Sequence, residues 1–222
     1  MESIGGDLMK RMSQLLCLSL ICLFLSGCLN QSKKSYPHLF DDYTVKKNLA
    51  LEIDTDERLL SKDTDFNELA YHSQDKAAII TQYNTYPQNF QDDTWQGLHI
   101  EIDTATLLQL KDYKSRDNTS YEAVLLVHFK FNSPERDVAI YPNNSLLIIG
   151  EKQEVEATLD MGYWDGEILK GVSKSGYTPF FIKTLNIEQL KNAKLLVKAN
   201  YLTSEFLDHE SQHTYNIPIK FD

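Results

Sequence analysis

The stretch Tyr121–Phe131, which reads Tyr-Glu-Ala-Val-Leu-Leu-Val-His-Phe-Lys-Phe, is the clearest structural signal in the chain. Every odd-numbered position in it is apolar, whereas Glu122, His128 and Lys130 occupy even-numbered positions. Because successive side chains of a β-strand point to opposite faces, this alternation predicts a strand with one face in a core. The β-branched and aromatic residues favour the same assignment.

Further segments on both sides of this stretch carry related patterns. Alternation marks Leu98–Ile102, Val155–Met161, Ala193–Tyr201 and Tyr215–Phe221, and short apolar runs mark Ser145–Ile149 and Phe180–Ile182. Turn signals separate them, at Asp117–Asn118, Asn132–Pro134, Pro142–Asn144, Trp164–Gly166 and Ser175–Gly176. About seven short strands at this spacing predict an antiparallel β-sandwich. Pro218 predicts an edge position for the last strand, and Ile187–Lys191 predicts one helical turn.

The order of these segments resembles the immunoglobulin-like domains of Gram-positive lipoproteins, in the telokin-like families of unknown function. A long hydrophobic strand that ends in an Asn-rich turn, Ala123–Asn132, carries the resemblance. So does a Gly-containing loop before an aromatic strand, Gly171–Phe181. The resemblance covers roughly residues 95–222 and implies an immunoglobulin-like sandwich there. Lys170–Gly171 stands where those families carry a Pro-Gly pair.

Residues 40–94 are acidic and only weakly patterned, which predicts a partly structured extension ahead of the sandwich. Alternation over Leu49–Ile53 predicts a short strand there. Helical spacing over Phe66–Ile80 predicts a helix with Asp65 as its N-cap. The chain therefore divides into a signal segment at 1–27, a tether at 28–39, the acidic extension at 40–94 and the sandwich at 95–222.

The N-terminal residues carry an export signal. Lys10 and Arg11 precede the apolar stretch Leu15–Leu25, which is shorter than the roughly 20 residues that a membrane span needs. The run Leu25-Ser26-Gly27-Cys28 then resembles the lipobox of bacterial lipoproteins. The resemblance implies cleavage between Gly27 and Cys28 and a diacylglycerol, with acyl chains such as palmitate, on the Cys28 thiol. An uncleaved N-terminal membrane helix is the alternative.

A lipid on Cys28 would hold the domain at the outer face of the cytoplasmic membrane of a Gram-positive cell. The outer membrane of a Gram-negative cell is the alternative location. Two further hypotheses concern the signal segment: translation begins at Met9, and Leu20–Gly27 resembles the peptide pheromones released from some lipoprotein signals. An ordinary hydrophobic signal core is the alternative to the pheromone.

Composition limits the partners that the chain can have. The 222 residues include 22 basic and 32 acidic side chains, for a net charge of -10, and residues 1–27 contribute nothing to that net charge. An acidic domain repels nucleic-acid phosphates and lacks a polybasic grip on anionic lipid. Cys17, Cys22 and Cys28 are the three cysteines, so the chain beyond Cys28 has no disulfide, cysteine zinc site or thiol nucleophile.

Three groups of residues are candidates for a site. The run His209-Glu210-Ser211-Gln212-His213 matches the zinc-protease pattern, in which two histidines on one helix face hold Zn²⁺ and the glutamate activates water. Its polar neighbours favour a loop instead. Tyr163 and Trp164, ahead of a turn, are candidates for an exposed binding surface. Acidic residues that could bind Ca²⁺, or simply form a solvated face, are Asp54, Asp56, Asp63, Asp65 and Glu68.

No catalytic set and no cofactor is expected, because the sequence has neither a Gly-x-Ser-x-Gly run nor a phosphate-binding glycine loop. The isolated histidines His72, His99 and His128 are expected at solvent-facing positions. We therefore expect a lipid-anchored, non-enzymatic module that binds a protein, a peptide or a wall polymer. A surface zinc hydrolase that uses His209, Glu210 and His213 is the alternative function.

Overall fold

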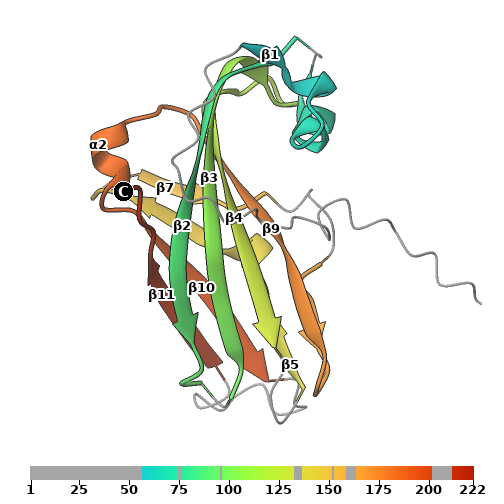
Figure 1. Cartoon of the computed structure of the whole chain (residues 1–222), viewed down its shortest axis with the longest axis vertical. Coiled ribbons are helices and arrows are strands. Elements are labelled where there is room, and N and C mark those ends of the chain that lie inside the picture. The colour runs from blue at the N-terminus through green and yellow to red at the C-terminus, as the bar shows by residue number, and fades with distance from the viewer. Residues whose placement is uncertain are drawn as a thin grey trace, which may run out of the picture. The chain divides into compact units, whose positions relative to one another are not determined.

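The strand predicted at Tyr121–Phe131 lies within β4 (Ser120–Asn132), an inner strand of a mainly β structure. The computed structural model describes residues 57–74, 77–95, 97–132, 137–151, 153–158, 164–201 and 212–222. The signal segment, the tether and the strand predicted at Leu49–Ile53 lie outside these residues. Two antiparallel sheets make up the fold, which confirms the predicted class (Figure 1).

The five-stranded sheet has the order β1-β2-β3-β4-β9, and all its neighbouring strands are antiparallel. β4 pairs with β3 on one side from Ser120 to Asn132, and with β9 on the other from Ala123 to Asn132. Figure 1 shows these long strands side by side. The other four strands are β1 (Arg58–Leu59), β2 (Ile79–Asp92), β3 (His99–Lys114) and β9 (Ser173–Ile182).

The second sheet is built around β10 (Lys194–Tyr201). β10 pairs with β11 on one side, and with β5 and β6 at different points along its other side. The short helix η3 (Pro142–Asn144) separates β5 from β6, and α2 (Ile187–Leu190) confirms the predicted helical turn. The remaining strands are β5 (Val138–Ile140), β6 (Leu146–Ile149), β7 (Gln153–Glu156), β8 (Gly166–Ile168) and β11 (Gln212–Pro218).

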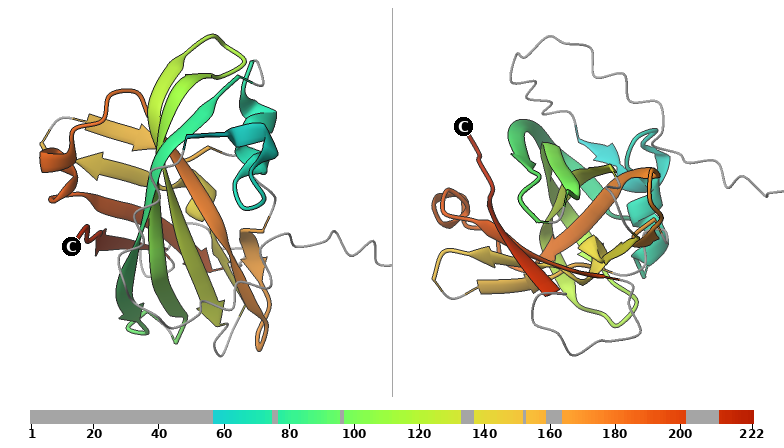
Figure 2. Two further views of the ribbon diagram at one scale, coloured as in Figure 1. Left: turned by 45° about the horizontal axis from the view of Figure 1, so that its top comes forward. Right: turned by 90° about the horizontal axis from the view of Figure 1, so that it is seen from below.

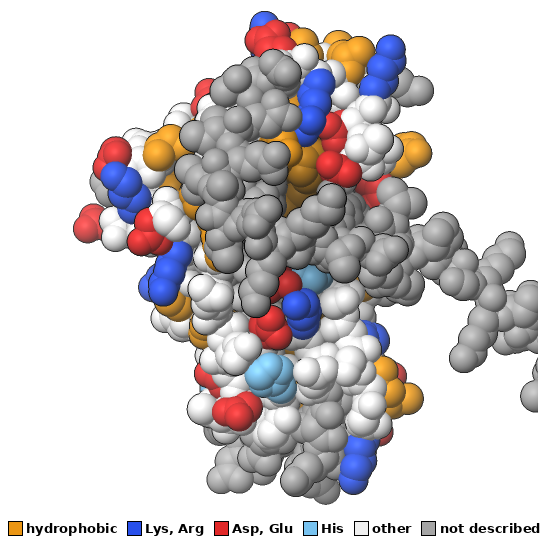
Figure 3. Space-filling model, viewed as in Figure 1, with side chains coloured by type: hydrophobic (Ala, Val, Ile, Leu, Met, Phe, Trp, Pro, Cys, Tyr) orange, Lys and Arg blue, Asp and Glu red, His pale blue; other side chains and the backbone are white. Residues whose placement is uncertain are grey.

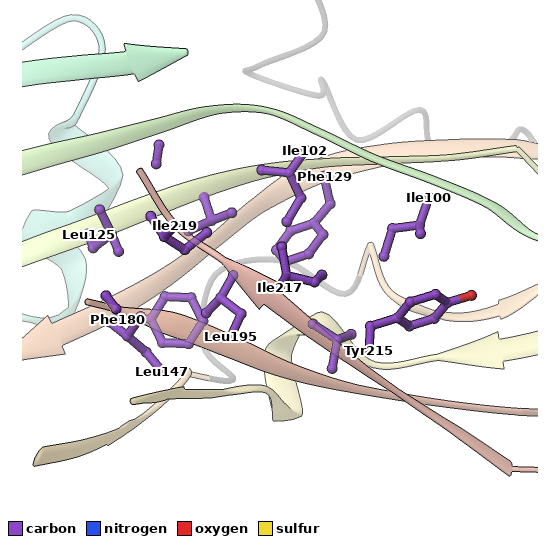
Figure 4. Close-up of a cluster of buried hydrophobic side chains, with 14 of the residues drawn as sticks. Ile100, Ile102, Leu125, Phe129, Leu147, Phe180, Leu195, Tyr215, Ile217 and Ile219 are labelled. Atoms are coloured by element: carbon purple, nitrogen blue, oxygen red, sulfur yellow. The ribbon is translucent and has the colours of Figure 1, made fainter. Parts of the chain in front are cut away.

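The main core lies between the two sheets, which face each other in Figure 2. Odd-numbered residues of β4 point into it, as their alternation predicts, and they meet apolar side chains of β10 and β11 (Figure 4). Burying each such large apolar side chain stabilises the fold by about 1.5–3 kcal/mol. Core residues drawn in Figure 4 include Ile102, Leu125, Phe129, Phe180, Leu195 and Ile217.

Gln88 links β2 to the end of the chain, where the two sheets meet along one side. Its amide Nε2 donates to the carbonyl oxygens of Tyr86 at 3.2 Å and Lys220 at 2.8 Å. Its Oε1 accepts from the backbone N–H of Lys220 at 2.9 Å. The ring of Phe221 then meets that of Tyr86 edge-on, with ring centroids 5.2 Å apart. The buried side chain of Gln88 thus hydrogen-bonds as a backbone amide would.

Trp164 packs beside β9. Its indole Nε1 donates to the carbonyl oxygen of Tyr177 at 3.1 Å, and its ring lies parallel to that of Phe131 with centroids 5.7 Å apart. Gly176 lies under the indole, because a Cβ at this position would fall 2.4 Å from Trp164 Cδ2. Gly176 is therefore a strand residue of β9, and the turn predicted at Ser175–Gly176 is wrong.

Residues before β2 cover the outer surface of the five-stranded sheet near one end. A second apolar cluster there joins Leu60, Phe66 and Leu69 to residues of β3, β4 and β9. The helix predicted over Phe66–Ile80 is wrong: η1 (Leu60–Lys62) and η2 (Asn67–His72) are short 3-10 helices, and β2 begins at Ile79. The helical spacing of Phe66, Leu69 and Ile80 arose because these three residues pack in one cluster on the sheet.

β2 belongs to the five-stranded sheet although it begins at Ile79, ahead of Trp95, where the sandwich was expected to start. Its pairing with β3 is irregular between Ile80 and Gln82 and again between Pro87 and Phe90, and Asn89 has a φ of 37°. Bulges shift the facing of a strand by one residue, so they erase the alternation that reveals strands in a sequence. The described part of the acidic extension is therefore an integral layer of the domain.

Candidate functional site

A β-bulge in β3 places a charged side chain at the middle of the five-stranded sheet. Ile102 pairs with Phe129 and Thr104 pairs with His128, which leaves Asp103 without a partner on β4. Ile102 points into the core, whereas Asp103 reaches His128 on the outer surface. Bulges commonly redirect side chains next to functional sites.

Four side chains gather around Asp103, and we call this group the Asp103 cluster: Glu101, Asp103, His128, Lys130 and Tyr177. Asp103 Oδ1 lies 2.7 Å from His128 Nδ1, and its Oδ2 lies 2.7 Å from Lys130 Nζ. Lys130 Nζ also lies 3.4 Å from Glu101 Oε1. The Tyr177 ring lies over the imidazole, with centroids 4.5 Å apart. Strands β3, β4 and β9 each contribute to the cluster.

The electrostatics of the cluster keep Asp103 ionised. Burial raises the pKa of Asp103, but hydrogen bonds and charges from His128 and Lys130 outweigh it and hold that pKa well below its usual range. The salt bridge in turn raises the pKa of Lys130 above its ordinary value. Burial, followed by the charge of Asp103, raises the pKa of Tyr177 to about 12 although a hydrogen bond with Thr104 opposes the shift. At neutral pH Asp103 is therefore a carboxylate, Lys130 an ammonium group and Tyr177 a neutral phenol.

The Asp103 cluster lies on a strand surface that reaches solvent. The side chain of His128 is 15% exposed and that of Lys130 is 42% exposed. Figure 3 shows acidic, basic and histidine side chains near the middle of this surface. The imidazole of His128 meets Asp103 through its Nδ1 atom. The arrangement suits recognition of a charged surface.

The sequence showed the polar residues of the cluster but not their association. Glu101, His128 and Lys130 occupy outward positions in alternating strands, and His128 was expected at such a position. Their meeting depends on the β3–β4 register and on the bulge at Asp103. Neither can be read from one sequence.

The sequence predicts an exposed binding surface at Tyr163 and Trp164. Tyr163 lies outside the described residues. Trp164 is half-buried and packs against Phe131 and Gly176, so the expected free aromatic surface is not formed by its indole. Asp165, the next residue, accepts from the backbone N–H of Asn143 at 3.0 Å. Burial raises the pKa of Asp165, and the hydrogen bond from Asn143 partly opposes the shift.

The zinc-protease pattern depends on a helix that includes His213. Instead, His213 lies in β11, where its ring stacks on that of Trp95 with centroids 5.7 Å apart. His209 and Glu210 lie outside the described residues. His213 therefore lies in a strand and not on the helix that the zinc-protease pattern needs.

Asp63, one of the proposed calcium ligands, is used within the fold. Its carboxylate lies 2.6 Å from Arg58 Nε and accepts from the backbone N–H groups of Asp65 and Phe66. The predicted N-cap Asp65 is wrong: Asp63 accepts the hydrogen bonds of the turn ahead of η2, whose N-cap is Phe66 without a side-chain cap. Asp54 and Asp56 lie outside the described residues, as do Gly27 and Cys28. Within the described ranges, no group of three or more His, Cys, Asp or Glu is arranged for a metal ion, and no helix is long and apolar enough to cross a membrane.

Comparisons with known proteins find structural likeness at low sequence identity. A functionally unknown protein from Listeria monocytogenes EGD-e is 14% identical with a TM-score of 0.49, over 65% of this chain and 88% of that one. The yjhA protein of Bacillus subtilis is 10% identical with a TM-score of 0.43, over 60% of this chain and 98% of that one. No family model matches the sequence, and no curated protein matches it.

A third likeness is to a Bacillus subtilis protein described as "a putative lipoprotein (ycdA)". It is 16% identical with a TM-score of 0.37, and the match covers 60% of this chain but only 39% of that one.

Proposed function

We propose that the chain is a bacterial lipoprotein whose sandwich is a non-enzymatic binding module. Diacylglyceryl on Cys28 anchors it to the outer face of the cytoplasmic membrane of a Gram-positive cell, with a Gram-negative outer membrane as the alternative. The Asp103 cluster is the surface at which a protein, a peptide or a wall polymer binds. The Asp103 cluster is the observation that carries the binding role.

The sequence of the N-terminus supports the anchor. Lys10 and Arg11, the apolar stretch Leu15–Leu25 and the small residues before Cys28 follow in the order that lipoprotein processing requires. Two acyl chains on one thiol suffice for stable membrane attachment, at about 0.8 kcal/mol for each buried CH₂.

The geometry of the Asp103 cluster supports the binding role. The ion pairs of Lys130, whose side chain is 42% exposed, contribute only about 0–1 kcal/mol to stability. The inner strands β3 and β4 nevertheless hold these charges in fixed positions, and the bulge is what brings Asp103 into reach of Lys130. Fixed charges on rigid strands give a partner specificity and fast association.

The anchor is tested by substituting the acylated thiol. In cells that express Cys28→Ser, we expect the protein to leave the membrane fraction and to lose incorporation of labelled palmitate. Globomycin should cause the uncleaved form of the wild-type protein to accumulate. Membrane retention of Cys28→Ser without any label would contradict the anchor.

The binding surface is tested with a matched pair of lysine variants. Lys130→Ala removes the ammonium group of the cluster, whereas Lys198→Ala removes an exposed lysine on the other sheet. Binding of the exported chain to purified wall sacculi and to detergent-solubilised membrane proteins is measured by co-sedimentation and chemical cross-linking. We expect at least one such complex to be lost with Lys130→Ala and kept with Lys198→Ala. Equal binding by both variants would remove the Asp103 cluster as the site.

A further inference from the structure

The turn between β8 and β9 exposes two large apolar side chains that lie three positions apart in the sequence. All five residues from Leu169 to Ser173 are exposed. Leu169 is 55% exposed and Val172 is 41% exposed. Lys170 and Gly171 lie between them. Leu169 and Val172 thus make an apolar tip that includes one positive charge, and we call residues 169–173 the apolar tip.

The apolar tip is held in a defined conformation. The N–H of Val172 donates to the carbonyl oxygen of Leu169 at 2.9 Å, and the N–H of Lys170 donates to Asp137 Oδ1 at 2.7 Å. Gly171 has a φ of 75°, and an added Cβ there would meet nothing within 4 Å, so the turn projects into open space. A fixed turn cannot fold its apolar side chains back onto the domain, which leaves them in water unless another surface covers them.

We propose that the apolar tip docks on the surface of the lipid bilayer to which the protein is anchored; this inference rests on the proposed function. Leu169 and Val172 would enter the boundary between headgroups and acyl chains. Lys170 lies between them, where its ammonium group can reach lipid phosphates while its stem lies along apolar surface. The tip therefore sets which face of the sandwich is directed away from the membrane.

The length of chain between the anchor and the domain allows this docking. Residues 29–56 separate Cys28 from the first described residue, and they can span at most about 90–100 Å. A connection of that length does not fix an orientation, but it keeps the domain at a high effective concentration near the bilayer. A weak interaction is then sufficient. The net charge of -10 opposes contact with anionic lipid elsewhere on the domain, which favours the apolar tip as the point of contact.

The test uses the lipidated protein with a single reporter cysteine. The chain beyond Cys28 has no cysteine, so Ser173→Cys gives one labelling position at the apolar tip. Ile187→Cys is the matched control: Ile187 is 47% exposed and lies in α2. Leu185, near α2, bonds to Glu122 at the start of β4, whereas Ser173 bonds to Asn132 at its end. The two labels are therefore separated by about 33 Å along β4.

Each protein carries an environment-sensitive fluorophore and is inserted through its lipid into protein-free vesicles of phosphatidylcholine and phosphatidylglycerol with nitroxide-labelled lipid. We expect a blue shift and severalfold stronger quenching at position 173 than at position 187. The substitutions Leu169→Ser and Val172→Ser, made together, should abolish both effects while far-UV circular dichroism stays unchanged. Leu169→Ser alone should give an intermediate result.

The outcomes separate the two proposals. Protein that does not float with the vesicles refutes the anchor, and the docking proposal falls with it. Protein that floats but shows no quenching at position 173, or equal quenching at both positions, refutes docking by the apolar tip and leaves the anchor intact. Quenching that survives the double serine substitution refutes it as well.

Discussion

Gly176→Ala is expected to destabilise the domain through a single contact, with the indole of Trp164. A Cβ at Gly176 would lie 2.4 Å from Trp164 Cδ2 and 2.5 Å from Cγ, closer than atoms approach without moving. The backbone itself accepts alanine, because Gly176 is absent from the residues with positive φ. The whole cost should therefore come from displacing the indole.

The magnitude follows from what the indole loses when it moves. It gives up the hydrogen bond to the Tyr177 carbonyl, worth about 0.5–1.5 kcal/mol, and part of its packing on Phe129 and Phe131. Overpacking of this kind costs about 1–3 kcal/mol. We expect a loss of about 2–3 kcal/mol and, for a domain of this size, a fall in Tm of about 4–12 °C.

The assay is urea unfolding of the exported chain followed by far-UV circular dichroism, in a double-mutant cycle with Trp164→Ala. In the Trp164→Ala background the clash is absent, so Gly176→Ala should be neutral or stabilise by up to about 1 kcal/mol. The coupling energy between the two positions should reach about 2 kcal/mol. Gly171→Ala is the control, because its strain comes from φ and should be the same in both backgrounds. An equal cost of Gly176→Ala with and without the indole would refute the reasoning.

Three further predictions concern polar side chains. Because the pKa of Asp103 is depressed in the folded state, its stabilising contribution is present above about pH 4 and is lost as the pH falls below that, so Asp103→Asn should flatten the acid limb of the stability–pH curve. The pKa of Asp165 is raised, so the sign reverses: Asp165→Asn, which keeps the acceptor for the Asn143 N–H, should be more stable than wild type near neutral pH, and the difference should shrink as the pH falls through the raised pKa and be gone below about pH 4. Gln88→Ala leaves the N–H and C=O of Lys220 unpaired and should cost about 1–3 kcal/mol in urea unfolding, whereas an unchanged midpoint would exclude a role for this link.

The segments that the sequence predicts as strands have a constant register over most of their length, and the predicted Leu98–Ile102 ends where the β3 bulge begins. β4 has no bulge within Tyr121–Phe131 on the β9 side, so its alternation in the sequence is the alternation in the structure. The sequence pattern does not reveal β2, because its fourteen positions contain two register irregularities. They also contain a proline and a residue with positive φ. Alternation in the sequence reveals a strand only where its pairing register is constant. A constant register is least needed in strands at the edge of a sheet.

The turn predicted at Gly176 is wrong because this glycine packs against the indole of Trp164. A Ser-Gly pair is a turn signal only when nothing else requires a missing side chain, and here the requirement comes from an indole twelve positions away in the sequence. Asp103 shows the same limit for the candidate site, because its place beside His128 depends on one unpaired residue in β3. Partners distant in sequence cannot be found from local pattern alone.

The sheet edges restrict how a partner can bind this sandwich. Along β9, the carbonyl oxygens of Tyr177 and Pro179 are taken by the Trp164 indole and by the N–H of Thr158, and Pro179 has no N–H to offer. β2 is interrupted by bulges, and β11 ends at Pro218 beside β10. Proline, bulges and covered groups are the features that prevent a further strand from adding to an edge. Along the edges formed by β9 and β2, a partner is therefore expected to use a face or a turn, such as the Asp103 cluster or the apolar tip, rather than to add a strand.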